Sequence, residues 1–342
     1  MTAPQRAEGT TAPQRAEGTA PPLRRSRDVP LLVERARAGD PRAVARLITL
    51  VESGDETLPQ VAAALAPHTG QAQVIGLTGS PGVGKSTTTN ELVRALRAQG
   101  RRVGVLAVDP SSPFTGGAIL GDRVRMQDHA TDAGVYIRSM SSRGHLGGLA
   151  AATPQAVRVL EGAGCDVVLV ETVGVGQAEV EVASLADTTL VLLAPGMGDA
   201  IQAVKAGILE IADVFVVNKA DRDGADATYR DIQGMLGLGE RTPGDWRPRV
   251  VRAVAARGEG IDDIVAAIDK HRAWLVEHGE LRRRREARAC AEVEAIALGE
   301  LRERLGSVRS GTALATLAAE VAAGRLDPYA AATRLLSDLD RG

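Results

Sequence analysis

A glycine-rich octapeptide, residues 79–86, fits the pattern G-x-x-x-x-G-K-[ST]. It follows the short apolar run 74–77 and opens a stretch with helical periodicity, the context that a phosphate-binding loop requires. Glycines let backbone N–H groups turn toward phosphate oxygens, and the N-terminus of the helix adds positive potential. We expect Lys85 to reach the β- and γ-phosphates and Ser86 to hold Mg²⁺ through its hydroxyl. The residues expected to contact the nucleotide here are Gly79, Ser80, Pro81, Gly82, Val83, Gly84, Lys85, Ser86 and Thr87.

A second motif, Asn218-Lys219-Ala220-Asp221, directly follows the apolar run 214–217. The Asp221 carboxylate can accept two hydrogen bonds from the N1–H and the exocyclic amine of guanine, a donor pair that adenine lacks. The stem of Lys219 can cover one face of the base, and Asn218 would tie the base loop to the phosphate loop. At the end of a strand downstream of a phosphate loop, this tetrapeptide predicts GTP and GDP as ligands.

Carboxylates after two other apolar runs are candidates for the metal site and for hydrolysis. Glu171 follows the run 167–170 and is expected to face the Mg²⁺ held by Ser86, directly or through water; a surface carboxylate is the alternative. Gly174 could offer its N–H to the γ-phosphate. Asp109 is a candidate to orient the attacking water, and Asp122 is either an indirect partner of magnesium or the N-cap of a helix over 123–129. The predicted catalytic residues are Lys85, Asp109 and Glu171.

Three other features favour structural interpretations. Asp199 and Lys205 are six residues apart and do not share a helix face, so spacing alone favours a capped, solvated helix. Arg282–Arg285 has acidic neighbours and no aromatic ones, which favours a solvated helix face over a nucleic-acid patch. No ligand-spaced cluster forms among His68, His129, His145, His271, His278, Cys165 and Cys290, so a structural zinc site or a nickel relay is unsupported.

The elements that must position these residues alternate short β-branched runs with helical stretches. The predicted strands are 74–77, 103–108, 135–139, 167–170, 189–193, 214–217 and 250–254. Most are continuous apolar runs, as a parallel sheet buried on both faces requires. The fold class is therefore α/β, a doubly wound and mostly parallel sheet, in which ligands bind beyond the carboxyl ends of the strands.

Four parts are expected along the chain. Residues 1–27 contain the nonamer TAPQRAEGT twice and predict a disordered tail, and residues 28–70 predict a small helical subdomain. Residues 71–278 form the nucleotide-binding domain. Residues 279–342 predict two helices with a break at 306–311, whose apolar stripe either packs on the same domain or crosses to a second copy.

Composition excludes several classes of protein. The chain has 342 residues and a net charge of −2, which argues against a protein that coats nucleic acid. No apolar run reaches the roughly 18 residues needed to span a bilayer, and no secretory leader is expected. Two cysteines cannot build a disulfide framework, so a reducing compartment, the cytoplasm, is predicted.

Taken in order, GLTGSPGVGKST, VDPSSPFTGGAILGDRVRM, ETVGVGQAE, LAPGMGDAIQAVKAGI and NKAD resemble the MeaB/ArgK/MMAA family of methylmalonyl-CoA mutase-associated GTPases. The resemblance extends over about residues 30–340. It implies a GTP-hydrolysing chaperone that gates cofactor loading on an adenosylcobalamin-dependent acyl-CoA mutase and protects the mutase from inactivation. It also implies a homodimer formed through the C-terminal helices.

The resemblance also assigns roles to single positions. Asp109, Asp122 and Glu171 match the switch and metal positions, with Ser86 as the other metal ligand. Gln177, Asp199 and Lys205 fall in segments that the family uses to communicate with its partner. The last guanine-loop motif, often Ser-Ala, is here Val254-Ala255-Ala256, where a backbone N–H can still meet the guanine oxygen. The alternatives are a nickel-delivery GTPase and, following the ArgK name, a small-molecule kinase.

Overall fold

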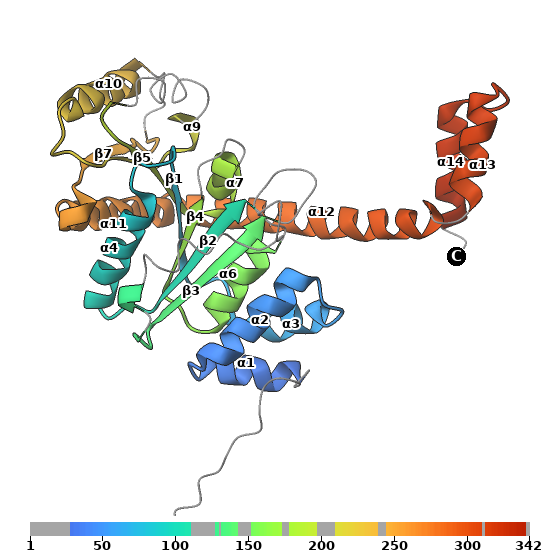
Figure 1. The fold of residues 1–342 in the computed structure, drawn as a ribbon, viewed down its shortest axis with the longest axis horizontal. Coiled ribbons are helices and arrows are strands. Elements are labelled where there is room, and N and C mark those ends of the chain that lie inside the picture. The colour runs from blue at the N-terminus through green and yellow to red at the C-terminus, as the bar shows by residue number, and fades with distance from the viewer. Residues whose placement is uncertain are drawn as a thin grey trace, which may run out of the picture.

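A computed structural model describes residues 28–110, 127–129, 131–142, 152–172, 178–196, 209–238, 244–309 and 312–339. One sheet of seven strands, in the order β3-β2-β4-β1-β5-β6-β7, forms its centre (Figure 1). All neighbouring strands run parallel. The strands are β1 (Gln73–Thr78), β2 (Val103–Pro110), β3 (Val135–Ser142), β4 (Val167–Thr172), β5 (Thr188–Leu193), β6 (Val214–Val217) and β7 (Arg249–Arg252).

The sheet confirms the predicted fold class. Strands β1, β4, β5 and β6 are buried along their whole length, so the continuous apolar runs have side chains packed on both faces. The last strand was expected over 250–254 but ends at Arg252. Val254 has left the strand and forms an isolated antiparallel bridge with Glu259.

Helices cover both faces of the sheet. On one face, α4 (Lys85–Ala98) and α11 (Ile261–Glu277) share a core with β1, β2 and β4. On the other, α6 (Thr153–Gly162) and α7 (Ala178–Leu185) pack with α1 (Val29–Arg37), α2 (Pro41–Ser53) and α3 (Leu58–Leu65). Helix α10 (Ala225–Leu238) covers β5 and β6. Short helical turns lie at Ala66–His68, Gln127–His129, Leu209–Ile211 (α9) and Ala255–Arg257.

The three leading helices belong to the same hydrophobic core as α6 and the sheet. Leu47 and Ile48 of α2 are fully buried in that core together with Leu160 of α6. The start of α2 follows the sequence, since the Asp40 side chain accepts the N–H of Arg42 at 2.9 Å and Pro41 occupies the first helical turn. These helices therefore pack against α6 and extend the hydrophobic core on that face of the sheet.

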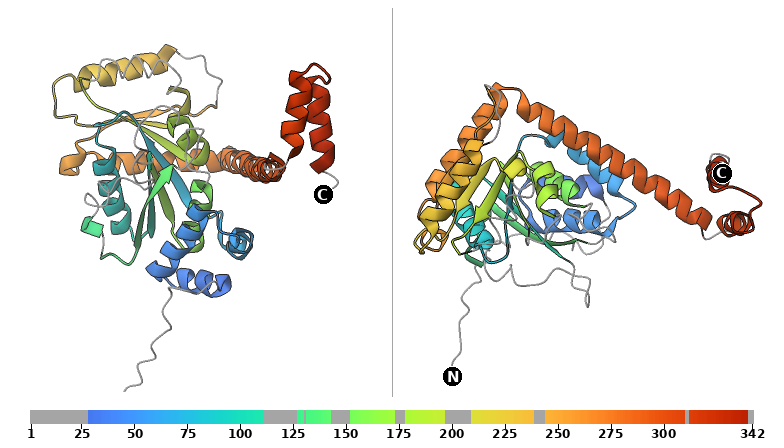
Figure 2. Two further views of the ribbon diagram at one scale, coloured as in Figure 1. Left: turned by 45° about the vertical axis from the view of Figure 1, so that its right-hand side comes forward. Right: turned by 90° about the horizontal axis from the view of Figure 1, so that it is seen from above.

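Beyond α11 the chain leaves the sheet along α12 (Glu280–Arg309), a helix of 30 residues. It carries α13 (Thr312–Ala322) and α14 (Pro328–Leu339), which stand as a hairpin well away from the sheet (Figures 1 and 2). The boundary between α12 and α13 falls within the predicted break at 306–311, but α12 continues past Gly306 to Arg309, and the second predicted helix is divided into α13 and α14. One glycine costs a helix only about 1 kcal/mol, which a long helix tolerates.

The root of α12 is fixed to the sheet by buried ion pairs. Arg284 Nη2 lies 2.9 Å from Asp213 Oδ1, and Arg285 Nη2 lies 2.8 Å from Asp187 Oδ2. The interpretation of Arg282–Arg285 as a solvated face is wrong for Arg284 and Arg285, although the side chains of Arg282 and Arg283 are 84% and 78% exposed. The turn of the helix directs two of the four side chains toward the two aspartates, which precede β5 and β6.

Candidate nucleotide site

The connection from β1 to α4 has a backbone that only glycine adopts easily. Gly79 and Gly84 have φ values of 139° and 98°. A Cβ atom on Gly79 would lie 2.3 Å from the Leu192 carbonyl oxygen, and one on Gly84 would lie 2.3 Å from Asn218 Nδ2. Both positive φ angles and close neighbours therefore require glycine at these two ends of the loop.

Lys85 lies across this loop and is buried. Its Nζ donates to the carbonyl oxygens of Gly79 at 2.7 Å and Ser80 at 3.1 Å. Because Lys85 is the first residue of α4, its ammonium adds to the positive potential of the helix N-terminus. The loop thus concentrates positive charge beside backbone groups, as an anion site requires.

Glu171 meets two hydroxyl groups of α4. Its Oε1 accepts from Ser86 Oγ at 2.6 Å and its Oε2 from Thr89 Oγ1 at 2.9 Å. The strand order explains the meeting: β4 lies beside β1, with Glu171 in register with Leu77, just before the loop. Thr89 was missed by the sequence analysis, although it follows Ser86 by three residues and so shares its helix face.

The oxygen atoms of Ser86 and Glu171 fit a magnesium ion. Mg²⁺ prefers oxygen ligands and is usually held in proteins by one or two carboxylates together with phosphate oxygens. Glu171 is 4% exposed and has a hydroxyl partner on each oxygen. This donor set would hold Mg²⁺ beside the phosphate loop.

Asn218 links the base loop to the phosphate loop. Its Nδ2 donates to the Val83 carbonyl oxygen at 2.8 Å, and its Oδ1 accepts the N–H of Ala255 at 3.0 Å. One buried side chain therefore joins three segments: the phosphate loop, the end of β6, and the turn after β7. Lys219, at φ 57°, also reaches the phosphate loop, where its Nζ lies 2.7 Å from the Gly82 carbonyl oxygen.

Asp221 lies on the exposed side of the same loop. Its Oδ2 is 3.3 Å from Arg257 Nη1, and Arg257 also pairs with Glu259. Arg257 was not among the predicted site residues. Its position directly after Val254-Ala255-Ala256 was the available signal, because that segment was expected to face the base.

The three residues of that segment differ in what their N–H groups do. Val254 N–H donates to the Glu259 carbonyl, and Ala255 N–H donates to Asn218. Among described residues, the N–H of Ala256 has no such backbone or side-chain acceptor. It is the donor of the three that remains available to a ligand.

Several predicted positions lie outside this geometry. The backbone of Asp109 lies at the carboxyl end of β2, paired with Ser141, and the structure describes no more of this residue. The other predicted positions outside the described residues are Asp122, Gly174, Gln177, Asp199 and Lys205.

The described part of the chain lacks two kinds of feature. No group of three or more His, Cys, Asp or Glu side chains there is arranged to hold a metal ion. No helix there combines the length and the apolar character needed to cross a membrane.

The sequence matches one family closely. The family described as methylmalonyl-CoA mutase-associated GTPase MeaB matches residues 44–309. A Pyrococcus abyssi protein with GTPase in its name is 47% identical over 315 residues, which are 91% of this chain and 97% of that protein. The Escherichia coli GTPase ArgK is 40% identical over 261 residues, which are 74% of this chain and 79% of ArgK.

Two further similarities extend this picture. The mitochondrial methylmalonic aciduria type A homolog of Mus musculus is 41% identical over 215 residues, which are 62% of this chain and 52% of the mouse protein. A solved structure of a protein described as a LAO/AO transport system kinase has a TM-score of 0.69 at 28% identity, covering 93% of this chain and 100% of that one. The phosphate loop, the Asn218 link and these similarities together place this chain in the MeaB family of methylmalonyl-CoA mutase-associated GTPases.

Proposed function

We propose that this chain hydrolyses GTP to GDP and phosphate in a Mg²⁺-dependent reaction at the β1–α4 corner. The observation that carries the proposal is the contact of Ser86 with Glu171, 2.6 Å apart beside the phosphate loop. When bound, magnesium supplies charge neutralisation on the phosphates. Ser86 and Glu171 would hold it, and the Thr89 hydroxyl would fix the second oxygen of Glu171.

Lys85 and the loop backbone would bind the phosphates. The Lys85 ammonium donates here to two loop carbonyls, and phosphate oxygens of a bound nucleotide would take their place as charged, stronger acceptors. Asp109, at the end of β2, is our candidate for orienting the attacking water. Gly174 is our candidate for sensing the γ-phosphate.

Guanine would be recognised by Asp221, Lys219 and the N–H of Ala256. Asp221 would accept from the guanine N1–H and amine, and Ala256 N–H would donate to the guanine oxygen. Arg257 lies 3.3 Å from Asp221 and competes for the carboxylate, so base binding would loosen this exposed ion pair. Such an exposed pair costs little to break.

Nucleotide titration tests this assignment. Asp221→Asn should weaken GTP and GDP binding about a hundredfold, because an amide accepts only one of the two guanine hydrogen bonds and opposes a donor with a donor. Asp223→Asn removes the same charge from a neighbouring exposed position and should change nothing. Equal affinity of the wild type for ATP and GTP would refute the assignment.

Hydrolysis tests the metal ligands and the reaction. Lys85→Ala should abolish GTP hydrolysis, and Glu171→Gln should lower it by at least about tenfold while raising the Mg²⁺ concentration that it requires. Glu210→Gln, an exposed carboxylate on α9, is the control. Undiminished, Mg²⁺-independent turnover in Glu171→Gln would contradict the proposed metal site.

A kinase is the competing activity, because the structurally similar protein is described as a LAO/AO transport system kinase. Labelled γ-phosphate distinguishes the two. Hydrolysis predicts that the label appears as free phosphate in the absence of any acceptor. Transfer to arginine or another metabolite, with none to water, would decide for the kinase.

The partner we propose is an adenosylcobalamin-dependent acyl-CoA mutase, whose cofactor loading this GTPase would gate and which it would protect. The family description and the name of the mouse relative support this partner. Gln177, Asp199 and Lys205 are our candidates for transmitting nucleotide state to it. A pull-down from cell extract, with GDP compared against a non-hydrolysable GTP analogue, should recover a cobalamin mutase subunit in a nucleotide-dependent amount.

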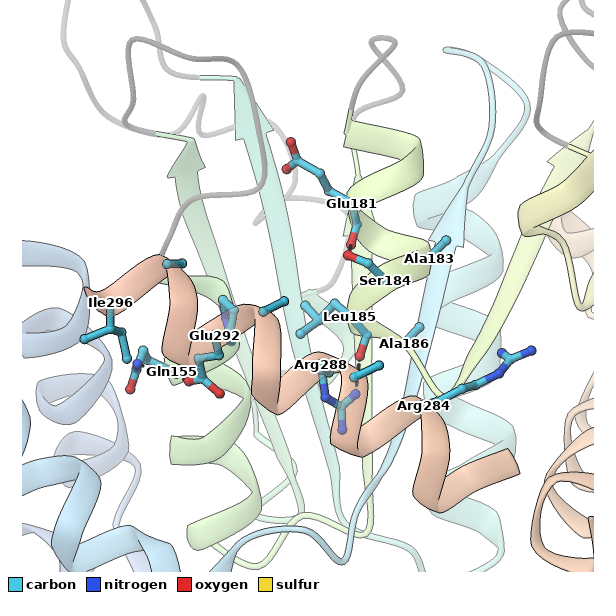
Figure 3. Close-up of a pocket in the computed structure, with 14 residues that line it drawn as sticks. Gln155, Glu181, Ala183, Ser184, Leu185, Ala186, Arg284, Arg288, Glu292 and Ile296 are labelled. Carbon is cyan, nitrogen blue, oxygen red and sulfur yellow. Dashed lines mark hydrogen bonds between the residues drawn. The ribbon is translucent and has the colours of Figure 1, made fainter. Parts of the chain in front are cut away.

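We also propose that the C-terminal helices form a homodimer. Helix α12 is about 45 Å long and exposes Val293, Ile296 and Leu301, which are 67%, 49% and 50% exposed. Beside them, α6, α7 and α12 enclose a mostly apolar cavity of about 560 Å³ (Figure 3). A projecting helix with several exposed apolar side chains favours a partner surface, and an identical arm supplies one of matching chemistry.

Sedimentation tests the dimer separately from the nucleotide site. Val293→Glu combined with Ile296→Glu should convert the protein to a monomer that still binds GDP. Arg282→Glu places a similar charge on the exposed side of α12 and should leave the dimer intact. A wild-type monomer at micromolar concentration would contradict the proposal.

A further inference from the structure

A second, polar cavity lies at the amino ends of the strands, on the opposite side of the domain from the phosphate loop. Its volume is about 410 Å³. It is bounded by the start of β1, the residue before β4, the segment after α4, and α11. The side chains that line it are Gln71, Gln73, Gln99, Arg101, Cys165, Asp166 and Arg272. Ligands of a doubly wound sheet bind at the carboxyl ends of the strands, so this cavity is separate from the nucleotide site.

The floor of the cavity contains an unsatisfied amide. Gln73 is 1% exposed, and its Nε2 has no hydrogen-bond partner in the described part of the chain. Buried polar groups are almost always paired, because an unpaired one costs about 1–3 kcal/mol. Cys165, the other buried residue of the floor, stays neutral since burial raises the pKa of its thiol to about 12. The amide therefore lacks an acceptor, and because its Nε2 is itself shielded from solvent, a ligand in the cavity meets it only when the Gln73 side chain turns.

Arg272 supplies a second unmet group on the wall. Over the residues that the structure covers, no carboxylate lies within ion-pair distance of its guanidinium. Burial lowers the pKa of Arg272, and the more distant Asp187 and Asp269 offset this only in part. A half-buried cation without a direct partner favours the approach of an anion.

The lining carries two guanidinium groups and one carboxylate, and one of the two guanidinium groups is already paired. Arg101 adds a second guanidinium, which touches Asp269 at 3.4 Å and is 31% exposed. The only carboxylate of the lining, Asp166, has one oxygen occupied by the N–H of Arg102 at 2.7 Å. Asp269 offsets Arg101, so Arg272 is the lining cation without an ion pair in the described part of the chain, and the amides of Gln71 and Gln99 add neutral donors.

We propose that this cavity binds a small oxyanion, a phosphate or a carboxylate, between Arg272 and Arg101 with the Gln73 amide at its floor. An oxyanion suits these donors because each of its oxygens accepts several hydrogen bonds and a planar guanidinium donates two in parallel. The volume admits a metabolite larger than inorganic phosphate. A bound anion would join the ends of α4 and α11 to the first residue of β1, the strand that leads to the phosphate loop.

Calorimetric titration of the full chain tests the site. Saturating Mg²⁺ and GDP fill the phosphate loop first, and inorganic phosphate or succinate is then added at constant ionic strength. We expect saturable binding of at least one of them, which separates phosphates from carboxylates as the ligand source. Arg272→Gln should weaken that binding by at least about tenfold, the effect of losing a charged hydrogen bond.

A control variant and a second variant of the site separate a specific effect from a general loss of charge. Lys270→Gln removes a positive charge from an exposed position of the same helix and should bind the anion like the wild type. Arg101→Gln is the second variant of the site, and an increase in Tm on adding the anion should be absent from both arginine variants. Two results would overturn the proposal: no saturable binding of either anion, or binding of unchanged affinity in Arg272→Gln. Neither result bears on GTP binding.

Discussion

The side chain of Asn218 gives the sharpest test of how the site is assembled. Among the contacts described above, this side chain alone joins the phosphate loop, the end of β6 and the turn after β7. Asn218→Ala removes both hydrogen bonds, to the Val83 carbonyl and from the Ala255 N–H, without adding any bulk. We expect it to lower both stability and nucleotide affinity.

The size of the effect follows from what the substitution leaves behind. Val83 and Ala255 are buried, so their carbonyl and N–H lose partners where water does not easily replace them. Each buried group left without a partner costs about 1–3 kcal/mol, so for the two groups together the free energy of unfolding should fall by about 2–6 kcal/mol. The freed loops must be ordered again when GDP binds, so the Kd for GDP should rise by about tenfold or more.

Urea denaturation and titration with fluorescent GDP measure the two effects. Thr228→Ala is the control. Among the described residues its partly buried hydroxyl bonds to Gly224 alone, at 3.1 Å within the α10 region, so the substitution should cost about 1 kcal/mol and leave the Kd unchanged. Asn218→Ala with wild-type stability and wild-type Kd would refute the reasoning. A stability loss with an unchanged Kd would show that the link braces the fold without organising the site.

Two more predictions concern other parts of the fold. Gly84→Ala should abolish nucleotide binding, since its Cβ would lie 2.3 Å from the Asn218 amide. Gly54→Ala, with φ 63° and no atom within 4 Å of the new Cβ, should lower stability alone. Nucleotide titration and thermal melting of both variants measure these effects. Burial lowers the pKa of His271 from 6.5 to about 4, although Asp213 partly opposes this. Below pH 6.5 the unfolded chain takes up the proton first, so the free energy of unfolding should fall by about 3 kcal/mol between pH 6.5 and 4. Urea melts across this range should show a shallower fall in His271→Asn; equal slopes would contradict the assignment.

Local patterns predicted the parts of the site that a single turn creates. The phosphate loop could be recognised because its glycines, Lys85 and Ser86 are consecutive, and the strand before it and the helix after it have short, clear periodicities. The same holds for the strand limits, which the structure moves by only a few residues at each end. The cap of α2 at Asp40 is equally local, because capping depends on two or three neighbouring residues.

The errors and omissions share one cause. Arg284 and Arg285 looked solvated from their charged neighbours, yet they pair with Asp213 and Asp187, about 70 and 100 residues earlier in the chain. Thr89 and Arg257 were missed because their partners, Glu171 and Asp221, are far away in sequence. A side chain's partner at long range depends on which helix face meets which strand end, and a window of neighbours does not contain that information.

The order of residues along the chain supplied the candidate groups: a glycine-rich loop, a carboxylate that we propose for guanine, oxygens that we propose for magnesium, and apolar runs for a buried sheet. Which of these groups meet depends on how the strands and helices pack. Glu171 reaches Ser86 across 85 residues because β4 lies next to β1, and Asn218 reaches Val83 across 135 residues because β6 ends at the same edge. Burial of both faces of the central strands favours a parallel sheet, and the order of its strands brings distant residues together at their carboxyl ends.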